Sequence, residues 1–257
     1  MFDHGQMRGD TPERAWSNRA GPPPATTTAA RRAGLAVEAR AQDEFGALSQ
    51  QRAEAAITAG FFATDITPVT LPDGTVVSTD DGPRKGVTVE GLAGLKPVFR
   101  PDGTVTAGNC CPLNDGAAAV IVMSDTRAKE LGLTPLARIV STGVTGLSPE
   151  IMGLGPVEAT KQALKHANMS IDDIDLVEIN EAFAAQVVPS YQDLGIDLDR
   201  LNVNGGSIAV GHPFGMTGAR LQNTLLNSLK WHDKQTGLIT MCVGGGQGMA
   251  MILERLS

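Results

Sequence analysis

Three short segments of this sequence place polar side chains where the chain leaves or enters regular structure. Segment 180–183, Asn-Glu-Ala-Phe, follows an apolar run and opens a predicted helix. Segment 204–215 is rich in glycine and contains His212, and segment 242–248 begins with Cys242 at the end of another apolar run. Because α/β proteins build their sites at the carboxyl ends of strands, we take these segments as the candidate functional site.

The residue types in these segments suit nucleophilic attack and proton transfer. A cysteine acts as nucleophile or base in its thiolate form, so Cys242 would need a neighbour that lowers its pKa. His212 could donate a hydrogen bond and relay a proton near neutral pH. Because all three residues follow predicted strands and precede turns, we expect Asn180, His212 and Cys242 to converge at one end of a sheet.

Each of these residues also has an ordinary structural interpretation. Asn180 could cap a helix, His212 could fill a loop, and Cys242 could be an inert buried thiol. The glycines could supply only positive φ angles, and they match neither a P-loop nor a strand–GxGxxG–helix unit. The joint occurrence of the three segments in one βα array favours the functional interpretation.

The composition excludes several classes of protein. The chain has 257 residues and a net charge of −7, which argues against a nucleic-acid binder. Its longest apolar run, 116–123, is far shorter than the roughly 20 residues that a membrane span needs. The three cysteines, Cys110, Cys111 and Cys242, predict no disulfide framework, which favours a cytoplasmic setting. The spacing of the four histidines suggests no metal site.

Hydrophobic periodicity predicts an α/β fold with helices on a mixed sheet. From residue 136 the predicted order is β-α-β-α-β-α-β-β, with strands at 137–142, 174–179, 201–203, 238–243 and 249–253 and helices at 156–167, 181–194 and 215–231. Upstream we predict a helix at 41–61, a loop-rich stretch at 82–109 and a buried strand at 117–123. Residues 1 to about 40 lack apolar periodicity, and we expect them to be disordered or foreign to the domain.

Together these motifs resemble those of the thiolase family. The family's C-terminal signatures are matched by Asn-Glu-Ala-Phe-Ala at 180–184, by Gly-His-Pro at 211–213 with Asn-Gly-Gly at 204–206, and by Cys-x-Gly-Gly-Gly at 242–246. Upstream, 108–118 is similar to the strand that follows the family's coenzyme A loop, and 84–88 and 95–99 resemble parts of that loop. With 148–156, which also fits, the resemblance covers about residues 41–257.

The resemblance implies a role for each matching residue. His212 matches the histidine that helps to activate the nucleophile and donates to the thioester oxygen, and Asn180 matches the asparagine that holds a water in the same oxyanion hole. Cys242 matches the second catalytic cysteine, which moves the proton during carbon–carbon bond cleavage or formation. Gly244 matches the glycine whose N–H contributes to a second oxyanion hole.

The resemblance also implies binding positions and a domain division. Met152, Phe183 and Phe214 match the acyl pocket, and Arg84, Thr88 and Cys111 match coenzyme A contacts, with Cys111 in place of a frequent serine. The expected parts are a disordered or foreign segment at 1–40, a loop-domain remnant at 41–114, the end of the N-terminal thiolase half at 115–135 and the complete C-terminal half at 136–257. We expect an N-terminally truncated chain, because the family's Cys-x-Ser-Gly turn with its nucleophile has no counterpart in the sequence.

The implied function is thiolytic cleavage of 3-ketoacyl-CoA, or the reverse Claisen condensation of acetyl-CoA, in fatty-acid metabolism. Coenzyme A would be a substrate rather than a cofactor, and the full-length form would be a homodimer or homotetramer without nucleic-acid, membrane or metal partners. Because the nucleophile has no counterpart, the alternative is a non-catalytic fragment that binds coenzyme A or oligomerises. A ketoacyl synthase matches less well, because that group has a second histidine where this chain has Cys242.

Overall fold

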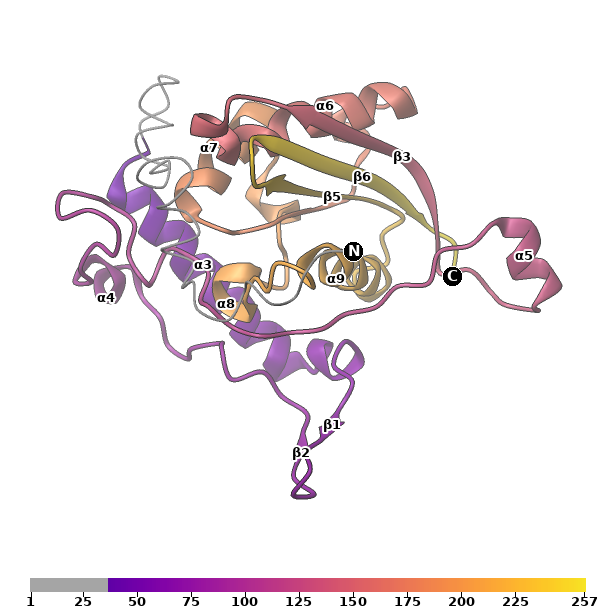
Figure 1. Ribbon diagram of the computed structural model, residues 1–257, viewed down its shortest axis with the longest axis horizontal. Helices are drawn as coiled ribbons and strands as arrows, with labels where there is room; N and C mark the ends of the chain where they lie inside the picture. Colours follow the sequence, from indigo (N-terminus) through magenta and orange to yellow (C-terminus); the bar gives the residue numbers. More distant parts are fainter. Residues whose placement is uncertain (1–36) are drawn as a thin grey trace.

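The computed structural model describes residues 37–257. At its centre lies a four-stranded mixed sheet in the order β3-β6-β5-β4 (Figure 1). The strands are β3 (Ala137–Gly146), β4 (Leu176–Ile179), β5 (Thr236–Val243) and β6 (Gln247–Arg255). β4 runs parallel to β5, whereas β6 is antiparallel to both β5 and β3. The carboxyl ends of β4 and β5 therefore lie at the same end of the sheet.

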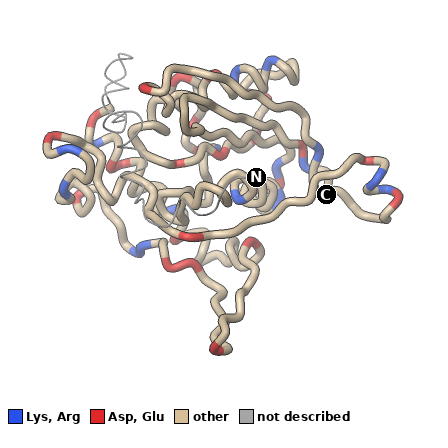
Figure 2. Tube along the Cα trace, in the orientation of Figure 1, with Lys and Arg blue, Asp and Glu red and all other residues tan. Residues whose placement is uncertain are grey.

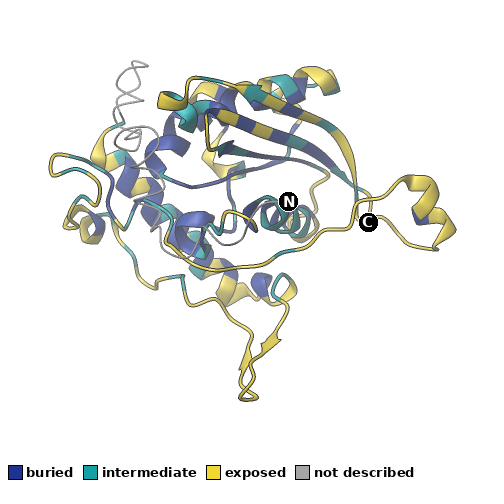
Figure 3. Ribbon diagram, viewed as in Figure 1, coloured by how far each residue is buried: buried dark blue, intermediate teal, exposed yellow. Residues whose placement is uncertain are grey.

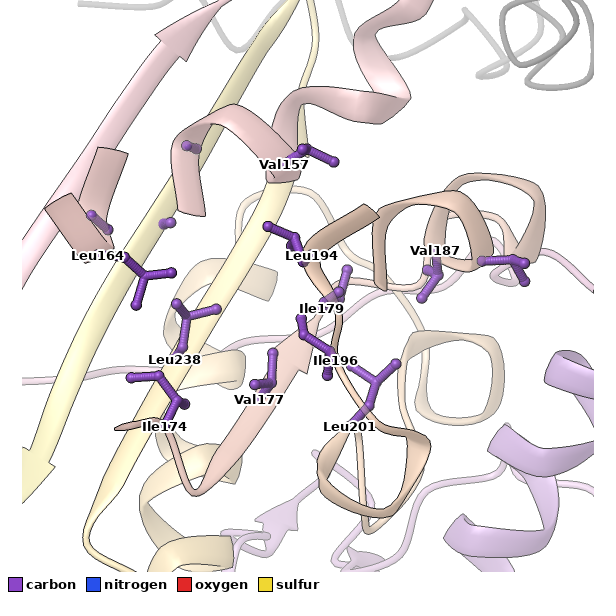
Figure 4. Packing of buried hydrophobic residues seen from close by; sticks show 14 of the residues in the cluster. Val157, Leu164, Ile174, Val177, Ile179, Val187, Leu194, Ile196, Leu201 and Leu238 are labelled. Carbon is purple, nitrogen blue, oxygen red and sulfur yellow. The ribbon is translucent and has the colours of Figure 1, made fainter. Parts of the chain in front are cut away.

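Helices cover both faces of this sheet. α6 (Gly155–Ala167) and α7 (Ala184–Leu194) pack on one face, and α9 (Thr217–Trp231) packs on the other. The core on the α6–α7 side is built from apolar side chains of both helices and three strands (Figure 4), among them Val157, Leu164, Val177, Val187, Leu238 and Ile252. On the other face Leu221, Leu225 and Leu229 recur every four residues along α9, so one stripe of the helix meets the sheet.

α6 lies very close to the sheet because glycines stand at the contact. A Cβ atom on Gly143 of β3 would lie 2.1 Å from the carbonyl oxygen of Ala159. A Cβ atom on Gly248 of β6 would lie 1.9 Å from the carbonyl oxygen of Gly155. Both positions therefore accept only glycine. Pro156 stands in the first turn of α6, where its missing N–H removes no helical hydrogen bond.

The chain before the sheet is dominated by α3 (Ala39–Ala59), which packs against α7 and α8 (Ser207–Val210). The shorter elements are η2 (Phe61–Thr64), β1 (Val69–Thr70), β2 (Val76–Val77), α4 (Val89–Ala93), α5 (Asp125–Glu130), η3 (Pro149–Leu154), η4 (Ile171–Asp173), η5 (Leu198–Arg200) and α8 (Ser207–Val210). The β1–β2 hairpin and α5 project from the body and are exposed (Figure 3). α5 carries charges of both signs, whereas β5 is free of charge (Figure 2).

The predicted order of elements from residue 136 is confirmed with one exception. The strand expected at 201–203 is reduced to a single bridge between Leu201 and Val177. Asn202 adopts a left-handed conformation with φ of 44°, which interrupts an extended strand. Its side chain replaces the missing backbone pairing, because Nδ2 donates to the carbonyl of Ile179 and Oδ1 accepts from the Ile179 N–H, both at 2.9 Å.

The predicted buried strand at 117–123 is wrong. Residues 111–124 are described, and none of them belongs to a helix or strand. The segment passes α9, where Asn223 Nδ2 donates to the carbonyl of Ala119 at 3.4 Å, and Ile121 is 86% exposed. Its composition favours a strand, but a strand also needs a neighbour that pairs with its backbone. No strand within residues 37–257 provides that neighbour.

The expectation for the first forty residues falls almost entirely outside the described part of the chain, which begins at residue 37. Residues 39 and 40 already belong to α3. Among the described helices, none combines the length and hydropathy that crossing a membrane requires.

Two isoleucines give a matched test of the core. Ile252 on β6 is fully buried, so Ile252→Ala should lower the free energy of unfolding by about 2–5 kcal/mol, because it leaves a cavity between strand and helices. Ile121→Ala should change that free energy by less than about 0.5 kcal/mol, because the side chain is already in water. Urea unfolding followed by circular dichroism measures both. Equal losses at the two positions would show that the core is assigned wrongly.

Candidate active site

Asn180 lies at the carboxyl end of β4, where the chain turns towards α7. Its backbone N–H donates to the carbonyl of Thr240 on β5 at 3.0 Å. Cys242 lies two residues after Thr240 on β5 and is buried. The strand ends that carry Asn180 and Cys242 therefore lie side by side, at the end of the sheet where the sequence predicts them.

His212 reaches this end of the sheet from the loop between α8 and α9. Its backbone N–H donates to Asn114 Oδ1 at 3.2 Å, which ties the loop to segment 111–124. Asn180 Nδ2 lies 3.3 Å from His212 Nε2 and 3.5 Å from Nδ1. The imidazole also meets the ring of Phe214 edge-on, with centroids 5.0 Å apart. The fold thus brings Asn180 and His212, 32 residues apart in sequence, into hydrogen-bond contact.

The hydrogen bonds around the imidazole determine which nitrogen carries the proton. Thr217 Oγ1 donates to the carbonyl of Pro213 at 2.8 Å, so its single proton is already used. Thr217 Oγ1 must then accept from His212 Nδ1, which lies 2.7 Å away. Nε2 keeps its lone pair, and the Nδ2 group of Asn180, which is a donor, lies close to both ring nitrogens rather than in line with that lone pair. The ring is therefore arranged to act as a base through Nε2.

The surroundings of His212 keep the ring neutral. Burial, and secondly the positive charge of Arg220, lower the pKa of His212 to about 4. The imidazole therefore carries no charge at pH 7, and Nε2 can take up a proton from a reacting group.

Glu181, the next residue after Asn180, joins three distant segments of the chain. Its Oε2 accepts from Ser49 Oγ of α3 at 2.6 Å and from the Ile208 N–H of α8 at 3.0 Å. Its Oε1 accepts from Asn202 Nδ2 at 2.7 Å. Gly206 leaves room for this carboxyl, because a Cβ atom there would lie 2.2 Å from Glu181 Cδ. Burial raises the pKa of Glu181, while these hydrogen bonds act in the opposite direction.

A second buried acid, Glu178, lies on β4 itself and faces α9. Leu176, two residues earlier, packs in the α9 core, so alternation along the strand places Glu178 on the same face. Its Oε2 has no hydrogen-bond partner among the described residues. Burial raises the pKa of Glu178 to about 8, against the opposing charge of Arg220. This carboxyl is therefore protonated at neutral pH.

The three cysteines are free thiols with raised pKa values. Burial raises the pKa to about 11 for Cys110 and Cys242 and to about 12 for Cys111. The backbone of Cys110 forms an isolated antiparallel β-bridge with that of Phe183, and the Cys111 N–H donates to the carbonyl of Ala182 at 3.1 Å. Negative charge on Cys242 would raise the pKa of Cys111 further. In the described part of the chain no charged side chain lowers the pKa of Cys242, and its thiol is neutral at pH 7.

The residues expected to line an acyl pocket occupy different places around this end of the sheet. Phe183 directly follows the buried turn and meets Phe99 edge-on at 5.8 Å. Met152 lies in η3, which packs against β5. Phe214 is 65% exposed and lies at the rim beside His212. Gly244 lies in the exposed turn between β5 and β6.

Arg84 and Thr88 are exposed and lie along α3. The Arg84 N–H donates to Gln50 Oε1 at 2.9 Å, and Gln50 Nε2 donates to the carbonyl of Ile208 in α8 at 3.2 Å. Arg84 is thus linked to the site through two hydrogen bonds. Thr88 Oγ1 accepts from the Gly91 N–H at 3.1 Å and caps α4.

Sequence analysis missed the side chains that orient these groups. Ser49 is a buried polar residue within the predicted helix at 41–61. It belongs to no recognisable motif, so the sequence did not mark it as functional. Asn202 and Thr217 flank the glycine-rich segment that was singled out, and only the folded chain shows their partners. Within residues 37–257, no group of three or more histidine, cysteine, aspartate or glutamate side chains is arranged to hold a metal ion.

Comparison with known families gives matches along most of the chain. The family model for the thiolase C-terminal domain matches residues 133–255, and the model for the thiolase N-terminal domain matches residues 12–126. The first match covers the sheet and its helices. The match to the N-terminal model begins at residue 12, inside the segment 1–40 that we expected to be disordered or foreign to the domain.

Individual relatives agree with these matches. The chain is 53% identical to the acetyl-CoA acetyltransferase of Thiocystis violacea over 220 residues, which cover 84% of this chain and 56% of that protein. It is 52% identical to the 3-ketoacyl-CoA thiolase of Photobacterium profundum, covering 84% of this chain and 58% of the relative. The crystal structure of the Bacillus anthracis acetyl-CoA acetyltransferase superposes with a TM-score of 0.86 at 43% identity, over 90% of this chain and 59% of that one. The chain thus spans somewhat more than half the length of the proteins that it matches.

Glu178 and Glu181 give a matched prediction about the two buried acids. Between pH 4.5 and about 8 the folded protein holds a proton on Glu178 that the unfolded chain releases, so this group lowers the free energy of unfolding as pH rises. Glu178→Gln should remove that slope and leave the variant more stable than the wild type at pH 8. Glu181→Gln should destabilise the fold by about 1–3 kcal/mol at pH 5.5, because an amide donor would face other donors.

Urea unfolding of both variants at pH 5.5 and pH 8 measures these effects. A Glu178→Gln variant that loses stability equally at both pH values would mean that the carboxyl is ionised and paired in the fold.

Proposed function

Because this chain belongs to the thiolase family, we propose that its site serves acyl transfer between coenzyme A thioesters. The reaction would be thiolytic cleavage of a 3-ketoacyl-CoA, or the reverse Claisen condensation of acetyl-CoA. The observation that carries this proposal is the contact between Asn180 and His212 beside the strand end that bears Cys242. The names of the relatives support the substrate class, since they are acetyl-CoA acetyltransferases and 3-ketoacyl-CoA thiolases.

In this proposal His212 works in two successive states. The neutral ring first takes the proton of an attacking thiol at Nε2, where the lone pair lies. The resulting Nε2–H then donates to the thioester oxygen as negative charge develops on it. Nδ1–H stays bonded to Thr217 throughout, which keeps the ring oriented. Asn180 supplies the neighbouring amide donor, directly or through a water.

Cys242 would move the proton at the carbon that leaves or attacks. In cleavage, a thiol adds to the β carbonyl and keeps the acyl group as a thioester, while the bond between the α and β carbons breaks and leaves an enolate of acetyl-CoA. The neutral Cys242 thiol then donates its proton to the α carbon of that enolate and becomes a thiolate. In condensation, the thiolate removes a proton from the methyl group of acetyl-CoA. The raised pKa of Cys242 suits the donating role at neutral pH. The Gly244 N–H would stabilise the enolate oxygen from the hairpin turn.

Binding of coenzyme A is assigned to groups outside this reacting centre. The exposed guanidinium of Arg84 suits a phosphate, because it presents a planar fork of donors. Thr88 and Cys111 would contact the rest of the arm. Met152, Phe183 and Phe214 would surround the acyl chain. Assembly as a homodimer or homotetramer is part of the same proposal.

A second candidate function is coenzyme A binding without turnover. It is favoured by one observation: the three cysteines are Cys110, Cys111 and Cys242, none lies in a Cys-x-Ser-Gly turn, and all have raised pKa values. The covalent acyl-enzyme step therefore has no evident nucleophile in this sequence. The two candidates share the coenzyme A contacts and differ in proton transfer.

Proton transfer can be tested without the covalent step. Transfer by Cys242 predicts that the protein exchanges the methyl protons of acetyl-CoA for deuterium, and that Cys242→Ala abolishes the exchange. Because the thiolate is the base and the pKa is about 11, the protein-catalysed rate should rise about tenfold per pH unit between pH 7 and 9. Proton NMR in D₂O measures the rate, with the Cys242→Ala protein subtracted as background. Exchange that is equal in the two proteins would contradict the acyltransferase role and favour the binding role.

Binding is tested by calorimetric titration with coenzyme A. Arg84→Ala should weaken binding by about tenfold, the equivalent of about 1.4 kcal/mol, because one charge-assisted phosphate contact is lost. Arg138→Ala is the control, since that arginine is equally long, is exposed on β3 and pairs with Glu254 away from the site. Equal effects of the two substitutions would mean that Arg84 acts only through net charge.

Turnover provides the remaining test. We expect little or no thiolysis of acetoacetyl-CoA by the purified chain, because no nucleophile is evident. If the chain turns over, His212→Ala and Cys242→Ala should each lower kcat and leave KM almost unchanged, since both groups act on charge that appears only along the reaction path. Asn180→Ala should be milder, because a water can partly replace the amide. Turnover that survives both His212→Ala and Cys242→Ala would contradict the assigned chemistry.

A further inference from the structure

Arg220 is a buried cation next to the site. It lies in the first turns of α9, three residues after Thr217, and Nη2 donates to Ser207 Oγ at 2.5 Å. Its Nε and Nη1 atoms are buried and have no hydrogen-bond partner in the described part of the chain. Burying a guanidinium with idle donors is unfavourable. A side chain that serves only packing would not need this charge.

The single bond that Arg220 makes determines the orientation of Asn180. A guanidinium can only donate, so Ser207 Oγ must accept from it. The Ser207 hydroxyl then gives its own proton to Asn180 Oδ1, at 2.6 Å. With its carbonyl oxygen held there, the amide of Asn180 presents Nδ2 to His212. Reversing that amide would set its NH₂ group towards the Ser207 hydroxyl and its oxygen against the ring nitrogens of His212.

We propose that Arg220 is a positioning residue for the site: acting through Ser207, it holds the amide of Asn180 so that its NH₂ group, and not its oxygen, lies against the His212 ring. The inference deepens the proposed function and rests on it for its catalytic meaning. A one-way chain of hydrogen bonds results. It starts at a group that can only donate, Arg220, and the imidazole continues it through Nδ1–H and Thr217 to a group that can only accept, the carbonyl of Pro213.

The charges around Arg220 come from several elements. Glu178 and Glu181 approach from β4 and its end, Asp65 from the turn after η2, and Asp80 from the loop after β2. No described carboxylate oxygen lies within 4.0 Å of the guanidinium, so its charge is not neutralised by a contact ion pair. That charge acts on His212, where it adds to burial in lowering the pKa. The positioning role and the charge effect can therefore be observed on one ring.

The test is NMR of the His212 imidazole nitrogens in the purified, ¹⁵N-labelled protein between pH 5 and 7.5, assigned with His212→Gln. The wild type should show one tautomer, with the proton on Nδ1, and almost no protonation at pH 5. Arg220→Met should give a mixture of tautomers and raise the pKa of His212 by about one unit, because the cation and the hydrogen bond are both lost.

Three further variants separate the two effects. Ser207→Ala keeps the cation and cuts the link, so it should mix the tautomers and leave the pKa low. Arg220→Lys keeps the cation, so the pKa should stay low. Arg52→Met is the matched control, because Arg52 is a half-buried arginine that donates to the carbonyls of Leu201 and Leu198 and makes no bond to Ser207. It should leave both the tautomer and the pKa of His212 unchanged.

An unchanged His212 tautomer in both Arg220→Met and Ser207→Ala would overturn the proposal. If Arg220→Met does not fold, the tautomer in Ser207→Ala decides alone. An equal disturbance in Arg52→Met would also overturn it, because the effect would then reflect general destabilisation. These spectra require no turnover. Failure of the deuterium exchange with acetyl-CoA, with the NMR result as expected, would reject the acyltransferase role and leave the positioning intact.

Discussion

The arrangement at the end of the sheet depends on one buried carboxylate, that of Glu181. Ser49 of α3, Asn202 and the N–H of Ile208 all donate to it, so three parts of the chain are fixed around one residue. A buried carboxylate is tolerable only when such donors satisfy it, and each donor is buried on the same condition. The constraint is mutual: α3 and α8 cannot move away from β4 without leaving a charge unpaired.

The active-site groups do not hydrogen-bond to the Glu181 carboxylate themselves but lie next to the residues that it holds. Asn180 precedes Glu181 on the chain, so fixing the carboxylate fixes the backbone from which the amide projects. α8, held at Ile208, carries Ser207 to the other side of that amide. His212 then enters from the loop that follows. The two buried acids differ in their partners. Glu181, just past the end of β4, has donors on both oxygens, whereas Glu178, on the α9 face of β4, has one oxygen without a partner among the described residues.

Much of the fold could be predicted from local pattern, because α6 and α9 each bury one face at helical spacing and the apolar runs of β4 and β5 are buried. The motifs also located Asn180, His212 and Cys242 correctly at one end of the sheet. What failed depended on partners: 117–123 has the composition of a strand without a neighbour, and 201–203 has its pairing made by the side chain of Asn202. Ser49 lies 132 residues from Glu181 in sequence, so no local pattern could connect them.

The unpaired run at 117–123 has a consequence for the behaviour of the protein in solution. It contains no charge and no proline, and three of its side chains are β-branched. An extended apolar segment with open backbone groups is a template on which a like segment of another molecule can add in cross-β fashion. Net negative charge opposes such encounters at pH 7, but it vanishes near the isoelectric point of about 5.1. The tendency to aggregate should therefore be greatest in mildly acidic buffers.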